Sequence, residues 1–379
     1  MEFPINEFQQ AETPFYYYDL SLLRRTLAEV KRTAGDVHVS YAVKANNDAR
    51  ILKLIAEAGL GADCVSGGEI EASLAAGFPA GKITFAGVGK TDREITIGLT
   101  AGIGCFNIES LPELEVINEL AGKLGKVAPV AIRVNPNIDA HTHSYITTGL
   151  AENKFGINLE QLADAIDAVR SLPNVSLRGL HFHVGSQVLS MEPYAHLCRR
   201  VAEIEASFPD VEFKVINVGG GLGIDYENPD ANPIPDFGAY FSTLHNNLQL
   251  RPGQEVHCEL GRSIVGQCGS LISRVVYVKH GTKKDFVIVD GGMSELIRPA
   301  LYDAHHPIQN LSAAAGGELM KYDVVGPVCE SSDVFATDEL LPETRRGDLI
   351  AFRCAGAYGE TMASNYNLRH LNPSIYYED

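Results

Sequence analysis

Val37-His38-Val39-Ser40-Tyr41-Ala42-Val43, closed by Lys44-Ala45-Asn46, is the stretch that decides the fold, because it has the pattern of a buried strand ending in a lysine. β-Branched and aromatic residues dominate the run, as is typical of strands. The apolar positions of residues 52–60 then predict a helix. A lysine at such a junction points into the mouth where α/β folds do their chemistry. A solvated loop lysine is the alternative.

Seven further strand-like runs repeat this pattern, and helical stretches separate most neighbours. The expected strands are Val37–Val43, Ala62–Val65, Ile83–Ala86, Gly104–Ile108, Val127–Val134, Leu177–His183, Phe213–Val218 and Glu255–Leu260. The expected helices include Gly67–Ala76, Leu111–Leu124, Leu159–Leu172 and Glu192–Phe208. Such a series of β/α units predicts an α/β fold, a closed (β/α)8 barrel of the TIM type, rather than an open sheet.

The sequence pattern changes after Arg262, where strand-like runs are joined by turns and few helical stretches are visible. These runs are Ser270–Lys279, Asp285–Asp290, Asp323–Val328 and Asp348–Arg353. We therefore expect the barrel to occupy residues 25–262 and a mostly β C-terminal domain to occupy residues 263–379. Thr13–Tyr18 is also strand-like, so residues 1–24 are expected to join the β domain.

Composition excludes several classes of partner. The chain of 379 residues has 31 Lys and Arg against 48 Asp and Glu, a net charge of −17, so neither nucleic acid nor an anionic membrane is an expected partner. We expect no signal peptide and no membrane span, because neither pattern is visible. The seven cysteines lack C-x-x-C spacing. That favours a reducing cytoplasm over a disulfide framework or a zinc ribbon.

Two glycine-containing motifs lie at the carboxyl ends of the last two expected barrel strands: Gly219-Gly220-Gly221-Leu222-Gly223 and Glu259-Leu260-Gly261-Arg262. Phosphate sites of barrels are often built from these two loops, where glycine lets backbone N–H groups approach phosphate oxygens. Tight turns alone are the alternative. Together with Lys44 after the first strand, the motifs predict a phosphorylated aldehyde cofactor held by the lysine. Pyridoxal phosphate is the candidate.

His183 and Glu259 suit the ring of that cofactor. Strand alternation places His181 and His183 on one face, and an imidazole at the strand end could stack on a pyridine ring. A histidine packed inside the barrel is the alternative. Glu259 could keep the pyridine nitrogen protonated, as carbanion chemistry requires. A salt bridge at the barrel rim is the alternative for Glu259.

Nine motifs, in order along nearly the whole chain, resemble the diaminopimelate decarboxylases, which are fold-type-III pyridoxal-phosphate enzymes. The motifs are Tyr41-Ala-Val-Lys44-Ala-Asn46, Gly61-Ala-Asp63-Cys-Val-Ser66-Gly-Gly-Glu69, His183-Val-Gly-Ser186-Gln187, Gly219-Gly-Gly-Leu-Gly-Ile224, Glu259-Leu-Gly-Arg262, Asp290-Gly-Gly-Met, Arg298-Pro-Ala-Leu-Tyr302, Gly326-Pro-Val-Cys329-Glu330-Ser331-Ser332-Asp333 and Gly356-Ala-Tyr358-Gly. One departure is Leu260, where the family usually has proline. Because its neighbours match, we expect a local backbone difference and no lost role.

The resemblance implies a role for each matching residue. Lys44 is similar to the Schiff-base lysine, His183 to the residue that stacks on the ring, and Glu259 to the partner of the pyridine nitrogen. Further cofactor contacts would be Asp63, Ser186, Gly220, Gly221, Gly261, Arg262 and Tyr358. The substrate-binding residues would be Arg262, Arg298, Tyr302, Glu330 and Tyr358. A guanidinium fork suits the distal carboxylate. Glu330 would hold the distal ammonium and Cys329 would donate the proton after CO2 leaves, both from the neighbouring subunit.

The implied protein is a homodimeric, pyridoxal-phosphate-dependent carboxy-lyase that converts meso-diaminopimelate to L-lysine and CO2, the last step of lysine synthesis. The alternatives are a same-fold decarboxylase of ornithine, arginine or a siderophore precursor, a non-catalytic pyridoxal-phosphate carrier, and an amino-acid racemase. Arg262 and Arg298 argue against ornithine, which has no distal carboxylate. The β domain and Cys329-Glu330 argue against the carrier, which is a lone barrel. A racemase would need a tyrosine base opposite the lysine.

No metal site is expected. His141 and His143 lie close in sequence but have no acidic or cysteine partner at ligand spacing. Residues 135–156 form a long, polar connection that we interpret as a candidate lid. A static surface loop is the alternative.

Overall fold

The computed structural model of the chain describes residues 3–136, 154–314 and 316–378. Contacts divide the chain into a barrel unit, residues 26–223 and 235–261, and a β unit, residues 1–25, 224–234 and 262–379. The domain boundaries at residues 24/25 and 262/263 stay predictions. Most of the candidate lid, together with His141 and His143, lies outside the described residues.

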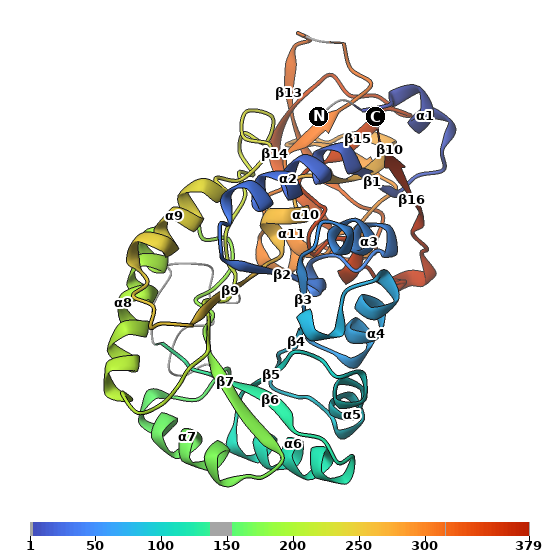
Figure 1. The fold of residues 1–379 in the computed structure, drawn as a ribbon. Coiled ribbons are helices and arrows are strands. Elements are labelled where there is room, and N and C mark those ends of the chain that lie inside the picture. The colour runs from blue at the N-terminus through green and yellow to red at the C-terminus, as the bar shows by residue number, and fades with distance from the viewer. Residues whose placement is uncertain (1–2, 137–153, 315, 379) are drawn as a thin grey trace. The chain divides into compact units, whose positions relative to one another are not determined.

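The barrel unit is a closed ring of parallel strands in chain order, with helices around its outside (Figure 1). The strands are β2 (His38–Ala42), β3 (Gly61–Cys64), β4 (Ile83–Phe85), β5 (Cys105–Ile108), β6 (Ala128–Arg133), β7 (Val175–His181), β8 (Val215–Asn217) and β9 (Glu255–Leu260). β9 pairs with β2 and closes the ring. The predicted (β/α)8 barrel is confirmed, and each expected strand overlaps an observed one.

The helical segments of the barrel unit connect successive strands. They are α2 (Leu20–Thr33, which begins in the β unit), η1 (Val43–Ala45), α3 (Ala49–Glu57), α4 (Gly67–Ala76), η2 (Ala80–Lys82), α5 (Asp92–Ala101), α6 (Leu111–Lys123), η3 (Leu159–Gln161), α7 (Leu162–Ser171), α8 (Glu192–Ser207) and α9 (Phe237–Asn247). Polar caps fix several starts. Asp48 accepts hydrogen bonds from the first backbone N–H groups of α3, and Thr91 and Glu94 form a capping box at α5.

The β unit is built on one eight-stranded sheet. Its strands are β1 (Phe15–Asp19), β10 (Gly269–His280), β11 (Asp285–Val289), β12 (Ile308–Asn310), β13 (Leu319–Val325), β14 (Val334–Pro342), β15 (Leu349–Phe352) and β16 (Asn372–Tyr377). The strand order is β12-β15-β10-β11-β13-β14. Short helices complete the unit: α1 (Ile5–Gln10), α10 (Arg262–Val265), α11 (Arg298–Tyr302), η4 (Glu360–Met362) and η5 (Tyr366–Leu368).

The N-terminal strand β1 belongs to this sheet. β1 pairs antiparallel with β10 and parallel with β16. Phe8 of α1 packs with Phe15 and Tyr17 of β1 and with Ile272 of β10 in one buried cluster. Apolar burial therefore attaches the N-terminal segment to the C-terminal part of the chain. Within the described parts of the chain, no helix combines the length and the apolar character that a membrane crossing requires.

Candidate active site

Lys44 lies just past the carboxyl end of β2, in the η1 turn. The adjacent Val43 and Ala45 are buried, whereas Lys44 is exposed. The Tyr41 hydroxyl donates a hydrogen bond to the Asn46 carbonyl at 2.9 Å, which ties the turn back to the strand. The turn therefore holds the lysine at the barrel end where the sequence predicted the active site.

Glu259 is a buried carboxylate near the carboxyl end of β9. His181 Nε2 lies 2.9 Å from its Oε2, and the Asn217 side-chain amide donates to its Oε1 at 2.7 Å. Asn107 donates to the same oxygen at 3.4 Å. Burial alone would raise the pKa of Glu259, but the charge and hydrogen bond of His181, helped by Lys44, bring that pKa well below its usual value. Glu259 is therefore an ionised acceptor inside the barrel.

Asp63 has the opposite electrostatic character. It lies on β3, one strand from Lys44, and it is 2% exposed. Burial, and then the negative charge of Glu259, raise the pKa of Asp63 well above its usual value. Among the described residues, nothing hydrogen-bonds Asp63 Oδ1. The two carboxyl groups thus differ in proton affinity, because their surroundings favour the ionised form of Glu259 and the protonated form of Asp63.

The glycine motif after β8 packs directly against His183. The Gly220 N–H donates to His183 Nδ1 at 3.2 Å. A Cβ on Gly220 would lie 1.9 Å from the Glu259 carbonyl oxygen, and Gly219 and Gly221 adopt φ values of +72° and +110°. These three positions therefore require glycine. Burial, and then neighbouring positive charges, lower the pKa of His183 well below its usual value, so its ring is neutral.

Two more predicted cofactor residues lie near these groups in the chain. Ser186 is half-buried in the loop after His183, and Gly261 is buried directly after β9. Leu260 is the last residue of β9 and is fully buried beside Tyr41 of β2. Leucine retains the N–H that proline lacks, so the departure from the family motif leaves the strand intact here.

In the β unit, the structure brings both predicted arginines together around Tyr358. The guanidinium carbons of Arg262 and Arg298 lie 5.0 Å and 5.9 Å from the centre of the Tyr358 ring. Arg262 Nη1 donates to the Tyr226 hydroxyl at 2.7 Å. Arg298 also lies 5.7 Å from the ring centre of Tyr302. The cluster is a buried positive site with aromatic walls.

Arg298 is 7% exposed, yet no carboxylate in the described chain forms an ion pair with it. Its Nε donates to His306 Nε2 at 3.3 Å, and His306 Nδ1 lies 3.0 Å from the Arg353 carbonyl. His306 accepts from Arg298 through one nitrogen and donates through the other, so its ring is neutral. A buried guanidinium without a carboxylate is costly, and a bound anion would compensate for it.

Cys329 and Glu330 occupy an exposed loop between β13 and β14. Asp333 shapes this loop, because its carboxylate accepts the backbone N–H groups of Val328 and Met293, each at 2.6 Å. The Glu330 carboxylate contacts the Tyr366 hydroxyl. The loop thus presents a thiol and a carboxylate at the surface of the β unit.

Sequence reasoning missed the residues that support the predicted ones. Asn107 and Asn217 hold Glu259, His306 orients Arg298, and Tyr226 binds Arg262. Each asparagine lies within a barrel strand, where a polar residue is a signal that could have identified it. His306 follows Arg298-Pro-Ala-Leu-Tyr302 closely, but nothing in its spacing indicated the contact.

Comparisons with known proteins agree along the whole chain. The family described as "Pyridoxal-dependent decarboxylase, pyridoxal binding domain" matches residues 20–266. A diaminopimelate decarboxylase of Bacteroides thetaiotaomicron is 56% identical, covering 100% of this chain and 98% of that protein. One from Aquifex aeolicus is 40% identical, covering 94% of this chain and 84% of the relative.

Solved structures give the same result. The crystal structure of diaminopimelate decarboxylase from Helicobacter pylori complexed with L-lysine superposes with a TM-score of 0.92 at 41% identity, covering 99% of this chain and 94% of that one. A lysine/ornithine decarboxylase from Vibrio vulnificus is only 22% identical and has a TM-score of 0.85, which shows a shared fold. The chain therefore belongs to the diaminopimelate decarboxylase family of pyridoxal-dependent decarboxylases.

Proposed function

We propose that this enzyme decarboxylates meso-diaminopimelate to L-lysine and CO2, the last step of lysine synthesis. The observation that carries the proposal is the arginine pair at Tyr358. Arg298 is buried without a described carboxylate partner, and Arg262 lies against the same ring. Diaminopimelate has a distal carboxylate that suits this site, whereas ornithine has none. A siderophore precursor or arginine has no specific feature here in its favour.

The barrel residues fit pyridoxal phosphate. Glu259 is a buried, ionised acceptor suited to a protonated pyridine nitrogen, and the neutral ring of His183 could lie against the cofactor ring. Asp63 Oδ1 is buried and lacks a described partner. The Gly219–Gly221 backbone leaves no room for side chains. We assign covalent attachment to Lys44 and further contacts to Ser186, Gly220, Gly221, Gly261, Arg262 and Tyr358.

When bound, pyridoxal phosphate supplies an electron-accepting ring that takes up the electron pair released as the Cα–carboxylate bond breaks. Glu259 keeps the ring nitrogen protonated. Arg262, Arg298 and Tyr302 hold the distal carboxylate, and Glu330 holds the distal ammonium. The Cys329 thiol then donates a proton to Cα, which replaces the departed CO2.

We further propose a homodimer in which Cys329 and Glu330 serve the partner's site. The support is their exposed position on the loop shaped by Asp333, in a β unit that does not carry Lys44. Seven free cysteines, each described and unpaired, support a cytoplasmic setting. The lid role of residues 135–156 stays a prediction.

The substrate proposal is tested by measuring CO2 release from meso-diaminopimelate, ornithine, lysine and arginine with the same purified enzyme. We expect turnover of diaminopimelate alone. Equal turnover of ornithine or lysine would contradict the role of the arginine pair. No CO2 from any of them, while the cofactor remains bound, would favour the carrier alternative.

The dimer proposal is tested by mixing inactive Lys44→Ala with inactive Cys329→Ala under conditions that exchange subunits. Half of the dimers become hybrids, each with one site that carries neither change, so activity should return to roughly a quarter of wild type. Mixing Lys44→Ala with itself is the control. No recovery despite demonstrated exchange would mean that each chain supplies its own Cys329.

A further inference from the structure

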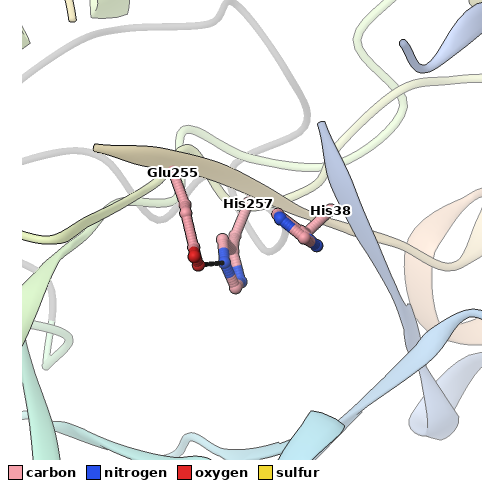
Figure 2. A group of neighbouring side chains, drawn as sticks. All are labelled: His38, Glu255 and His257. Carbon is pink, nitrogen blue, oxygen red and sulfur yellow. Dashed lines mark hydrogen bonds and ion pairs between the residues drawn. The ribbon is translucent and has the colours of Figure 1, made fainter. Parts of the chain in front are cut away.

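A cluster of metal-binding side chains lies at the end of the barrel opposite Lys44. His38 is the first residue of β2, and Glu255 is the first residue of β9, with His257 two positions along. Strand alternation places Glu255 and His257 on one face. The parallel register sets His38 beside His257. In Figure 2 the three side chains project from these two neighbouring strands toward one another.

The spacing of these side chains is close to that of a metal site. His257 Nε2 lies 3.3 Å from Glu255 Oε2, and one ligand atom from each of the three residues lies within 4.8 Å of the others. Tetrahedral zinc, with bonds of about 2.0–2.1 Å to nitrogen and oxygen, separates its ligands by about 3.3 Å. The Glu255–His257 pair already has this separation. Side-chain rotation of His38, whose ring centre is 4.8 Å from that of His257, would complete the set.

The surroundings leave room for an ion. The three residues line a cavity of about 500 Å³ within the barrel unit. The side chains of His257 and Glu255 are 24% and 52% exposed, so solvent ions reach them. Three protein ligands leave a fourth position open, which water would occupy. Arg178 lines the same cavity and could pair with an anion in place of that water.

We propose that His38, Glu255 and His257 bind a divalent transition metal at the amino end of the barrel. Two imidazoles and one carboxylate are a donor set for Zn2+ and related ions. This site differs from the expectation above, where neither the cysteines nor His141 and His143 indicated a metal. The ion would connect the first and last strands at the seam that closes the barrel. At the opposite end of the barrel, Lys44 follows β2 and Glu259 lies near the end of β9.

The test is a calorimetric titration of the holoenzyme with Zn2+ in phosphate-free buffer. The enzyme is first treated with a chelator to remove metal and then dialysed. We expect one Zn2+ per chain bound at this site. His257→Ala and His38→Ala should each weaken it at least about tenfold, since even outer-shell changes cost that much. Co2+ in place of Zn2+ should give the visible absorption of a four-coordinate ion. Zn2+ should also raise the thermal unfolding midpoint of wild type by more than that of His257→Ala or His38→Ala.

His280→Ala is the matched control, because His280 also contacts a carboxylate, Asp285 at 3.0 Å, but has no second imidazole described nearby. It should bind Zn2+ like wild type. Cofactor absorbance and unfolding in chelator would verify that each variant folds, and Glu255→Gln replaces any histidine variant that does not. Unchanged affinity in all of the ligand variants, or no saturable binding by wild type, would overturn the proposal.

Discussion

His306 gives a direct test of how the β unit holds Arg298. Its imidazole is 2% exposed and lies between the Nε of Arg298 and the Arg353 carbonyl. Burial, and then the positive charge of Arg298, lower the pKa of His306 from 6.5 to about 3. The ring therefore stays neutral in the folded protein at pH 5, whereas the same residue in the unfolded chain becomes protonated.

The sign of the effect follows from counting protons. Below pH 6.5 the unfolded chain binds one more proton at His306 than the folded chain, until the pH approaches about 3. The stability tied to the neutral ring is thus fully present above pH 6.5 and is lost progressively as the pH falls. At about 1.4 kcal/mol per pH unit, lowering the pH from 7 to 5 removes about 2 kcal/mol of the free energy of unfolding.

Urea unfolding of the holoenzyme at pH 7 and pH 5 measures this loss in the free energy of unfolding. Wild type should lose about 2 kcal/mol more between the two pH values than His306→Gln. Glutamine does not titrate, but its amide can still accept from Arg298 and donate to the Arg353 carbonyl. Contributions from other titrating groups cancel in the comparison. His280→Gln, at a side chain that is 70% exposed, should behave like wild type.

Equal losses in wild type and His306→Gln would refute the argument, because they would mean that His306 takes up the same number of protons in both states. Activity offers an independent check. Since the folded ring stays neutral, kcat/KM for diaminopimelate should show no titration of His306 between pH 7 and pH 5. A loss in that window that His306→Gln removes would place the folded pKa far higher.

Three further predictions concern single residues of the barrel unit and of the β unit. Lys44→Ala should abolish the absorbance of the covalently held cofactor and nearly all turnover, because such roles are each worth orders of magnitude; retention of both would remove Lys44 from the mechanism. Arg298→Lys should leave that absorbance intact and cost about 2–3 kcal/mol in kcat/KM for diaminopimelate, since the fork contact is lost. Asn217→Leu removes the 2.7 Å bond to Glu259. A hydrogen bond to a charged group is worth about 1.5–3 kcal/mol, so this substitution should move the acid limb of the kcat–pH profile upward by at least about one pH unit. An unchanged acid limb would show that Asn217 does not stabilise the charge of Glu259.

The barrel could be predicted because each strand and helix has a strong local pattern. The expected strand Glu255–Leu260 and helix Gly67–Ala76 match β9 and α4 to the residue. The β unit was harder, because β12 has only three residues and β14 carries Asp338 and Glu339 in a half-exposed strand. Such strands form through pairing with neighbours far along the chain, and local periodicity does not record that pairing.

The candidate site residues also divide into those with a local sequence signal and those without one. Lys44, His183 and Glu259 could be predicted because each follows or ends a strand, and a barrel brings strand ends together. Their supporting contacts depend on which side chains meet across the barrel. Asn107 and Asn217 reach Glu259 from β5 and β8, at sequence separations of 152 and 42 residues. No sequence-spacing rule connects residues at such separations along the chain, so these contacts could be found only in the structure.

The contrast between Asp63 and Glu259 shows what those contacts accomplish. Burial raises the pKa of any carboxyl group, and both side chains are almost fully buried. Glu259 differs because His181 and Asn217 stabilise its charge. Asp63 Oδ1 has no described partner, and the charge of Glu259 opposes its ionisation. Asp63 therefore holds a proton more tightly than Glu259 does. In the function proposed above, Glu259 keeps the pyridine nitrogen protonated, as carbanion chemistry requires, so the neighbours that hold its negative charge matter to that role as much as the carboxylate itself.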